Sequence, residues 1–347
     1  MNTAQPPSYQ NLKKHLGVYH ARAVQRIKDH IPEKGPRESL YDLVLDYPTR
    51  GGKGFRPGLC MATCNAFGGD NELALNTAAS LELFHNAFLV HDDIEDESLL
   101  RRGKPTMHQK EGLGIAVNVG DAMNVLGMRP LMANISILGH EQAWEIFTEV
   151  EHMVRQSVEG QAMELNWVRS NSSCISEEDY LEMVLKKTCW YTTIHPMRLG
   201  ALIADVEISL DEFNLLGYYM GAAFQIQDDV LNLVADEEKY GKEKGGDILE
   251  GKRTLMLIHL MNHCSKKEGT EIKEFLGKER SCRSAADIEW IMTLMEKYGS
   301  INHGIVSSKQ LAGAALHEFT RLFSSLPAHP DKEMMEDLVM YMIHRDY

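Results

Sequence analysis

The sequence predicts an all-helical protein, and two observations support this prediction. Strand-like alternation of apolar and polar residues, bounded by turn signals, is hard to find anywhere in the 347 residues. Apolar residues instead recur at the three-and-four spacing of a helix face over long stretches. The 11 prolines agree with this reading, because none falls between residues 197 and 326, where a proline inside a helix would break it.

Four stretches carry this spacing clearly enough to be assigned as long packed helices, with Gly, Asn, Ser and Asp marking the breaks between them. In chain order they are residues 71–97, 142–168, 177–204 and 211–235. The first is opened by GGDN at residues 68–71 and is closed before Gly103 and Pro105.

The domain organisation follows from what separates these helices. No Gly/Ser-rich or Pro-rich linker occurs between residues 50 and 320, and no fixed-period repeat is visible. We therefore expect a frayed N-terminus over residues 1–10 and a single helical domain over 11–347. The composition, 44% hydrophobic and 25% charged, is typical of a soluble globular protein with a sizeable core.

Charge and terminal composition exclude several classes of partner. A formal net charge of -14 argues against a protein that coats nucleic acid, because phosphate contacts need clustered Lys and Arg. No apolar run approaches the roughly 18 residues of a membrane helix, and the N-terminus lacks the apolar core of a signal peptide. We expect a cytoplasmic protein without a transmembrane segment, whose 6 cysteines stay reduced.

Residues 92–96 read DDIED and place four carboxylates at the C-terminal end of the first predicted helix. Asp92 and Asp96 are four residues apart and share a helix face, whereas Asp93 and Glu95 point elsewhere. A helix C-terminus favours cations over free carboxylates, so this cluster is poorly placed unless it binds metal. We interpret it as a site for hard divalent ions; a solvated acidic helix end is the alternative.

A second aspartate pair makes the metal interpretation stronger. Residues 224–232 read FQIQDDVLN, again at the end of an apolar helical run, and each pair is followed by basic residues around glycines, LLRRGKPT at 99–106 and YGKEKGGDILEGKRT at 240–254. Mg²⁺ binds one or two carboxylates and completes its octahedron with phosphate oxygens and water. The two clusters therefore predict a diphosphate site, and the absence of a GxxxxGK[ST] loop excludes a P-loop.

Together with GGKGFRP at 51–57 and EGKRTL at 250–255, these motifs resemble the trans-isoprenyl diphosphate synthases of the polyprenyl synthetase family. The resemblance spans residues 45–260 and the combination is very specific. It implies an all-helical bundle around a central active-site cavity, usually a homodimer. It also implies that the chain condenses an allylic diphosphate with isopentenyl diphosphate, which lengthens the allylic chain by five carbons and releases pyrophosphate.

The resemblance assigns roles around the allylic diphosphate, where catalysis must stabilise the departing pyrophosphate and exclude water from the carbocation. The implied metal set is three Mg²⁺ ions, two on Asp92 and Asp96 and one on Asp228, with supporting roles for Asp93 and Asp229. Lys187, Lys242 and Arg101 would contact the diphosphate, Lys252 is a further candidate, and Thr188 and Gln225 would present oxygens near the cation. No side chain is assigned as the base, since the family uses the bound pyrophosphate to accept the final proton.

The second substrate needs cations of its own. Lys53, Arg56, His85 and Arg102 match the family's isopentenyl diphosphate site. His85 lies seven residues, or about two helical turns, before Asp92 and therefore shares its face. Read alone, His85 would be a core histidine and Lys53 or Arg56 would be loop charges.

In the family, the positions four and five residues before the first motif help to line the elongation pocket. Here these positions are Phe88 and Ala87, and we predict the product length from them. One aromatic and one small residue imply an intermediate chain length. We expect geranylgeranyl diphosphate, with twenty carbons; farnesyl diphosphate is the alternative.

One position departs from the DDxxD pattern, because Asn232 replaces the last aspartate of the second motif. Its carbonyl can still accept a hydrogen bond, although it carries no charge. Two alternatives stay open: a regulatory subunit that has kept the fold but lost catalysis, and a class I terpene cyclase. A cyclase would have no use for the isopentenyl diphosphate site.

Overall fold

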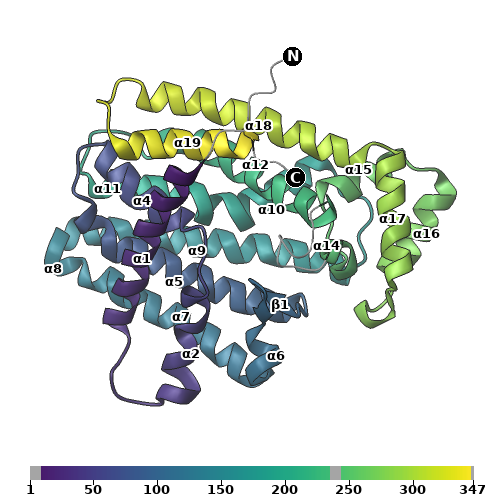
Figure 1. Ribbon diagram of the computed structural model, residues 1–347, viewed down its shortest axis with the longest axis horizontal. Coiled ribbons are helices and arrows are strands. Elements are labelled where there is room, and N and C mark those ends of the chain that lie inside the picture. Colours follow the sequence, from purple (N-terminus) through teal and green to yellow (C-terminus); the bar gives the residue numbers. More distant parts are fainter. Residues whose placement is uncertain (1–8, 235–243, 345–347) are drawn as a thin grey trace.

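The computed structural model describes residues 9–234 and 244–344, and these ranges are built almost entirely from helices (Figure 1). Its helices are α1 (Gln10–His30), η1 (Arg37–Tyr41), α2 (Asp42–Val44), α3 (Asp46–Thr49), α4 (Phe55–Ala66), α5 (Asn71–Glu95), α6 (Met107–Glu111), α7 (Leu113–Ala133), α8 (Ile135–Leu138), α9 (His140–Arg169), α10 (Glu177–Val184), η2 (Leu185–Ile194), α11 (His195–Ile203), α12 (Glu212–Val234), α14 (Gly246–Glu250), α15 (Leu255–His263), α16 (Lys266–Leu276), η3 (Arg280–Cys282), α17 (Ala285–Lys297), α18 (Ser300–Phe323) and α19 (Pro330–His344). The only strands in the described ranges, β1 (Leu100–Arg101) and β2 (Lys104–Pro105), form an antiparallel pair in which Leu100 faces Pro105. The predicted all-helical class is confirmed.

The predicted long helices coincide with observed ones. Residues 71–97 correspond to α5, 142–168 lie within α9, and 211–235 correspond to α12. The GGDN signal marks the start of α5, since the Asp70 side chain accepts a hydrogen bond from the Glu72 amide as an N-cap. No helix of the described residues is both long enough and apolar enough to cross a membrane.

The stretch 177–204 is continuous but not uniform. It contains α10, then η2, then α11, and the ten residues of η2 are π-helical. The expectation of one regular helix was therefore incomplete, because apolar residues at three-and-four spacing do not show where the hydrogen bonding changes from α-helical to π-helical. Such segments are rare and frequently occur at functional sites.

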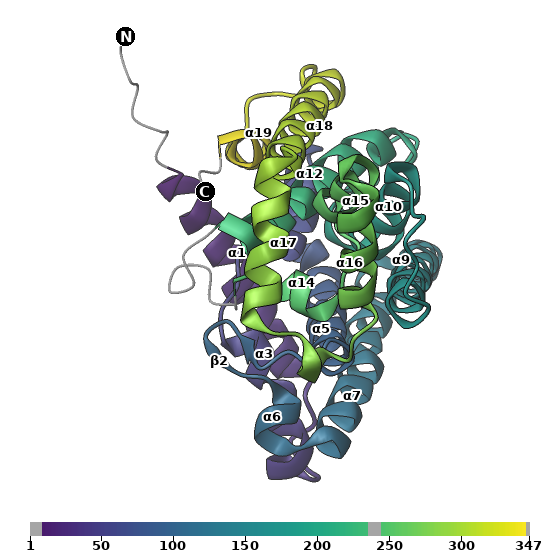
Figure 2. The ribbon, with the colours of Figure 1, turned by 90° about the vertical axis from the view of Figure 1, so that its right-hand side faces the viewer.

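Packing places α5 and α12 at the centre of the molecule. α5 packs against α4, α7 and α1, while α12 packs against η2 and α18. Figure 1 shows α18 and α19 along one edge and α15, α16 and α17 at one end, and Figure 2 views the molecule from that end.

The helix ends that carry the two aspartate pairs are fixed by separate apolar cores. Leu83, Ala87 and Val90 anchor the C-terminal half of α5 in a cluster with residues of α1 and α7. Val230 and Leu233 anchor the C-terminal half of α12 in a cluster with residues of α10, α15, α16 and α17. Each pair therefore sits on a helix whose C-terminal half is anchored in an apolar core.

Candidate active site

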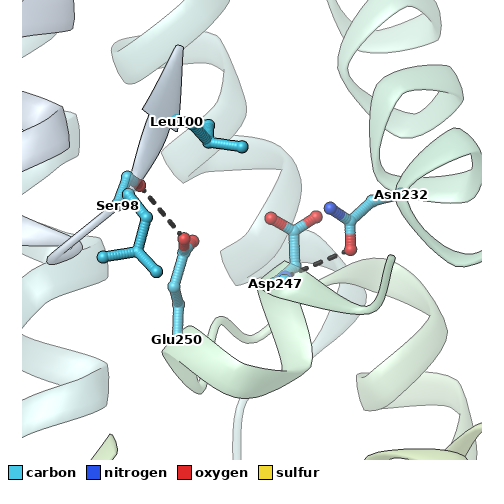
Figure 3. Close-up of a pocket in the computed structure, with 7 residues that line it drawn as sticks. Ser98, Leu100, Asn232, Asp247 and Glu250 are labelled. Atoms are coloured by element: carbon cyan, nitrogen blue, oxygen red, sulfur yellow. Dashed lines mark hydrogen bonds between the residues drawn. The ribbon is translucent and has the colours of Figure 1, made fainter. Parts of the chain in front are cut away.

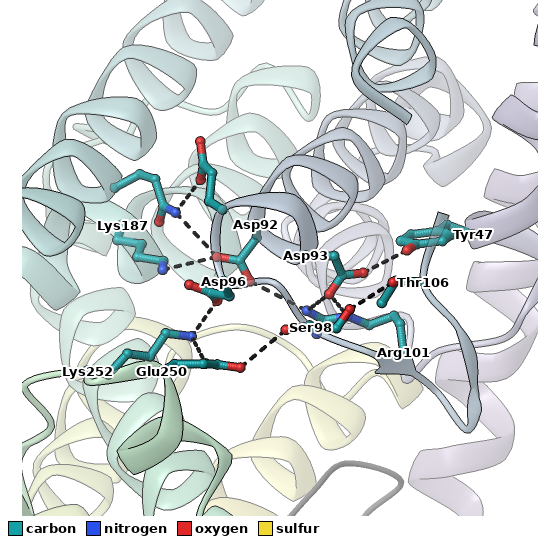
Figure 4. Close-up of polar contacts among 12 residues, drawn as sticks. Tyr47, Asp92, Asp93, Asp96, Ser98, Arg101, Thr106, Lys187, Glu250 and Lys252 are labelled. Atoms are coloured by element: carbon teal, nitrogen blue, oxygen red, sulfur yellow. Dashed lines mark hydrogen bonds and ion pairs between the residues drawn. The ribbon is translucent and has the colours of Figure 1, made fainter. Parts of the chain in front are cut away.

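The first acidic wall, formed by Asp92 and Asp96, lies at the C-terminal end of α5 and is faced by two lysines (Figure 4). Lys187 of η2 places its Nζ 3.2 Å from Asp92 Oδ1. Lys252, which follows α14, places its Nζ 2.6 Å from Asp96 Oδ2. The structure thus brings together both predicted metal ligands of the first motif and two of the predicted diphosphate-binding lysines.

Each of these lysines lies between two carboxylates. Lys187 also contacts Glu164 of α9, and Lys252 Nζ is 2.9 Å from Glu250 Oε2. Burial lowers the pKa of both lysines, but the flanking carboxylates more than compensate and raise it above the ordinary value. Four carboxylates therefore share two ammonium groups in the described part of the site.

This excess of negative charge fits a metal site. Burial, opposed by Lys252, raises the pKa of Asp96 to about 8, so a bound cation would relieve a real electrostatic cost. Among the described residues no three His, Cys, Asp or Glu side chains converge closely enough to hold a metal alone. That arrangement suits Mg²⁺, which takes few protein ligands and completes its shell with phosphate oxygens and water.

Asp93 points away from this wall, as its helical position predicts. Its side chain is fully buried, accepts a hydrogen bond from the Tyr47 hydroxyl at 2.7 Å, and is paired with Arg101 through the guanidinium Nε at 2.9 Å. Arg101 lies on β1 and also approaches Asp92, with 3.5 Å between Nη2 and Oδ2. Arg101 thus borders the site while its guanidinium neutralises the two aspartates.

The two aspartates of the second motif also have different surroundings, since Asp229 is buried and Asp228 is partly exposed. Asp229 is buried and accepts hydrogen bonds of 2.8 Å from both the Tyr180 hydroxyl and the Gln225 amide. Burial raises the pKa of Asp229 well above its ordinary value, and nearby Asp247 adds to the rise. The Thr188 hydroxyl donates to the Gln225 carbonyl at 2.9 Å, so one hydrogen-bonded chain joins η2, α12 and α10.

Asp228 is partly exposed on the face of α12 that also carries Phe224 and Gln225, four and three residues earlier. That face is the one from which Gln225 reaches Thr188, a predicted site residue. Lys242, predicted to contact the diphosphate, lies outside the described residues.

Two of the predicted isopentenyl diphosphate residues, Arg56 and His85, lie beside the same ring, that of Tyr191. We call the four predicted residues (Lys53, Arg56, His85 and Arg102) the cationic cluster. Burial lowers the pKa of His85 well below its ordinary value, and the charges of Arg56 and Arg102 lower it further, so the positive charge of this part of the cluster comes from its arginines. Arg102 donates to the Tyr47 carbonyl at 3.0 Å. Lys53 Nζ lies 5.6 Å from the Phe55 ring and 5.5 Å from the Phe224 ring.

Two buried nitrogens of this cluster are suited to an anion. His85 Nδ1 and Arg56 Nε have no hydrogen-bond partner among residues 9–234 and 244–344. Buried polar groups without partners are costly, and an anionic ligand would satisfy them. The Arg56 guanidinium also donates to Thr192 Oγ1 at 2.8 Å and stacks 4.2 Å from the Tyr191 ring.

The two predicted chain-length residues lie on different faces of α5. Phe88 contacts the Tyr191 ring edge to face, with 5.5 Å between ring centroids. Ala87 is fully buried in the apolar cluster with Val119 and Met123 of α7. Successive residues on a helix are about 100° apart, which is why Phe88 faces η2 while Ala87 faces the core.

Asn232 has a structural role that the sequence did not reveal. It is buried, and its side-chain oxygen accepts from the Asp247 amide at 3.1 Å (Figure 3). Its backbone carbonyl accepts from the Gly245 amide at 2.8 Å. The same small pocket holds a 3.2 Å hydrogen bond from Ser98 to Glu250. The last position of the second motif thus holds α14, the helix that precedes Lys252.

Sequence reasoning missed several residues that shape the site, namely Tyr47, Glu164, Tyr180, Tyr191 and Glu250. One signal was available for Glu164: Gly160 lies one turn earlier in the interior of α9, and a Cβ there would come within 2.3 Å of the Lys187 amide nitrogen. A glycine inside a helix is destabilising unless another backbone must approach closely. The other four are recognisable only from tertiary contacts.

Comparisons with known proteins give matches over most of the chain. The family model described as Polyprenyl synthetase matches residues 38–295. The chain is 34% identical over 320 residues to the geranylgeranyl diphosphate synthase of Sulfolobus acidocaldarius, covering 85% of this chain and 93% of that protein. The crystal structure of geranylgeranyl pyrophosphate synthetase from Pyrococcus horikoshii is similar with a TM-score of 0.84 at 30% identity, covering 97% and 99% of the two chains. Geranylgeranyl pyrophosphate synthase from Corynebacterium glutamicum, complexed with isoprenyl diphosphate and magnesium, gives 0.83 at 26% identity over 96% and 99%.

Proposed function

This chain belongs to the polyprenyl synthetase family, and we propose that it forms geranylgeranyl diphosphate at the site described above. It is a prenyltransferase that joins an allylic diphosphate to isopentenyl diphosphate and releases pyrophosphate. The observation that supports this function best is the separation of two anion sites. The first acidic wall with Lys187 and Lys252 suits a metal-bound diphosphate, and the cationic cluster around His85 suits a metal-free one.

We propose that three Mg²⁺ ions bind at the first acidic wall and Asp228. They would neutralise charge on the departing pyrophosphate. The relative from Corynebacterium glutamicum, whose structure holds magnesium and isoprenyl diphosphate, supports the choice of metal. The fit rests on this chain's own residues, because carboxylates on two helix ends with basic neighbours match the ligands that Mg²⁺ and a diphosphate need.

The side chains have distinct tasks in the reaction. Lys187 pairs with Asp92 and Lys252 pairs with Asp96, so both ammonium groups are within reach of a diphosphate bound at these aspartates. They would donate hydrogen bonds to its oxygens as the allylic carbon–oxygen bond breaks. Thr188 and Gln225 would present their oxygens to the carbocation. The double bond of isopentenyl diphosphate then attacks the allylic carbon, and the released pyrophosphate accepts the proton that is lost.

The cationic cluster would hold the second substrate. Arg56, already oriented by Thr192 and Tyr191, and His85 offer donors that lack partners within the described chain. Bidentate arginine contacts suit a diphosphate better than the single point charge of a lysine does.

We propose that the enzyme is a homodimer, on the basis of apolar side chains on α7, α8 and α9 that are exposed in the single chain. Val125, Met132 and Trp144 are 70%, 65% and 69% exposed, and Ile135 and Ile137 lie between them in sequence. Exposed apolar patches of this kind commonly mark interfaces. We place the enzyme in the cytoplasm, where its 6 free cysteines would stay reduced.

One experiment tests the proposed function directly. The pure protein is incubated with Mg²⁺, isopentenyl diphosphate and each short allylic starter, and the dephosphorylated products are separated by chromatography. We expect a twenty-carbon alcohol as the main product. A fifteen-carbon end product would favour the farnesyl alternative, and no elongation with any starter would favour a regulatory subunit.

A further inference from the structure

Tyr191, in the middle of η2, contacts residues of both proposed substrate regions. Its ring lies 4.2 Å from the Arg56 guanidinium carbon, and its centroid is 5.9 Å from that of His85 and 5.5 Å from that of Phe88. Arg56 and His85 belong to the cationic cluster, whereas Phe88 belongs to the proposed elongation pocket. One ring therefore contacts residues of both regions.

The spacing along α5 and η2 places this ring one step below the reacting end. Lys187 of η2 faces Asp92 of α5. Four residues later on η2, Tyr191 faces Phe88, which lies four residues before Asp92 on α5. The two helical segments thus run antiparallel past each other across the site. One turn of an α-helix such as α5 rises about 5.4 Å, which is close to the length of one isoprene unit.

The Tyr191 and Phe88 rings meet between η2 and α5. The two rings meet edge to face at an interplanar angle of 88°. Both side chains are only partly buried, whereas their sequence neighbours Ala87 and Thr192 are buried. Phe88 and Tyr191 therefore each keep part of their surface accessible, while Tyr191 also packs against an apolar core cluster.

The same ring also orients Arg56. The guanidinium is fixed from one side by stacking on Tyr191 and from another by its 2.8 Å hydrogen bond to Thr192, the next residue on η2. A substitution that removes the Tyr191 ring would leave Arg56 with one of these two contacts, the hydrogen bond to Thr192. Cations stacked on aromatic faces are held in a defined geometry.

We propose that Tyr191 is a specificity-determining residue that limits product length together with Phe88 and positions Arg56 for isopentenyl diphosphate. This inference rests on the proposed function, because it names the wall against which the growing chain stops.

The test compares Tyr191→Ala, Tyr191→Leu and Tyr191→Phe with the wild-type enzyme, by product chromatography and by separate Michaelis constants for the two substrates. Tyr191→Ala should lengthen the main product by at least one isoprene unit. It should also raise the Michaelis constant for isopentenyl diphosphate on the order of fivefold while leaving the allylic constant unchanged. Tyr191→Phe keeps the ring and should resemble wild type in both respects.

Tyr191→Leu keeps an apolar side chain in place of the ring. This variant replaces Tyr191→Ala in the test if the alanine variant does not fold. It should raise the isopentenyl constant as the alanine variant does, because the aromatic face is lost, with a smaller change in product length. The double variant Phe88→Ala/Tyr191→Ala should lengthen the product less than the sum of the two single changes, because the two rings form one barrier.

The outcomes separate this inference from the function on which it rests. If wild type makes no elongated product, the proposed function is wrong. If wild type elongates and active Tyr191 variants keep both the product profile and the isopentenyl constant, the role of Tyr191 is wrong while the function stands. A phenylalanine variant that behaves like the alanine variant would place the effect in the hydroxyl and overturn the ring model.

Discussion

The Tyr47 hydroxyl donates a 2.7 Å hydrogen bond to the buried carboxylate of Asp93. The second motif repeats the relationship, since Tyr180 donates to Asp229 at 2.8 Å. In each DD pair the second aspartate is therefore held inside the protein by a tyrosine. The first aspartate, Asp92 or Asp228, is left partly exposed.

Tyr47→Phe should weaken both the fold and the response to metal. The change removes a partner of Asp93 and the acceptor of the Met107 amide, so we expect a loss of about 1–3 kcal/mol in the free energy of unfolding. Because Asp93 shares Arg101 with Asp92, the Mg²⁺ concentration for half-maximal activity should also rise. Denaturant unfolding and a Mg²⁺ titration measure the two effects.

The control for this variant is Tyr41→Phe. Tyr41 makes no side-chain hydrogen bond within the ranges that the structure describes, and it belongs to the same apolar neighbourhood. It should change neither quantity. A less stable Tyr47→Phe enzyme with an unchanged Mg²⁺ response would restrict Tyr47 to a purely structural role.

Asp92→Ala and Asp228→Ala should each nearly abolish turnover, because the metal cluster needs carboxylates from both helix ends. We expect losses on the order of a thousandfold or more, with folding retained. Asp29→Ala, at an exposed position of α1, is the control and should be neutral. Turnover within severalfold of wild type in either site variant would refute the two-wall arrangement.

Lys187→Ala should be milder, on the order of a hundredfold to a thousandfold slower in turnover, as expected for one preorganised donor to developing charge. Lys186 is a matched control, because it is adjacent in sequence but pairs with Glu159 at 2.7 Å outside the site. Steady-state kinetics of both alanine variants make the comparison. Equal effects at the two positions would count against a direct contact between Lys187 and the diphosphate.

Phe88 and Ala87 should respond differently to substitution, because they occupy different surroundings. Phe88→Ala should shift products toward longer chains while leaving the first condensation nearly intact. Ala87→Phe should instead overpack the core of α5 and α7 and reduce the free energy of unfolding by about 1–3 kcal/mol. Product chromatography and unfolding measurements on both variants separate the two effects; a shorter product from a stable Ala87→Phe enzyme would contradict this assignment.

Asn232→Asp should keep most of the activity, since aspartate preserves the acceptor for the Asp247 amide. Asn232→Leu removes it and leaves that amide without its partner, so α14 should loosen and Lys252 should lose its position on Asp96. Amide hydrogen exchange over residues 245–250 would detect the loosening. Equal exchange in the leucine variant and wild type would show that Asn232 does not hold α14.

Much of the fold and part of the site could be predicted from local sequence. The spacing of Asp92 and Asp96, the N-cap at Asp70 and the apolar period of α12 are properties of single helices, so they can be read without a structure. The direction in which Ala87 points could not be predicted, because the sequence does not say which neighbouring helix covers which face of α5. The pairing of Lys187 with Glu164 joins residues on different helices and depends entirely on tertiary packing.

The contacts of Lys187 and Lys252 have a consequence for how the protein matures. Each ammonium serves as an internal counterion that neutralises part of the acidic site from within. The carboxylates therefore do not need a metal to hold them together while the chain folds, in contrast to small domains that fold only around their ion. A chelator should stop the chemistry and spare the fold.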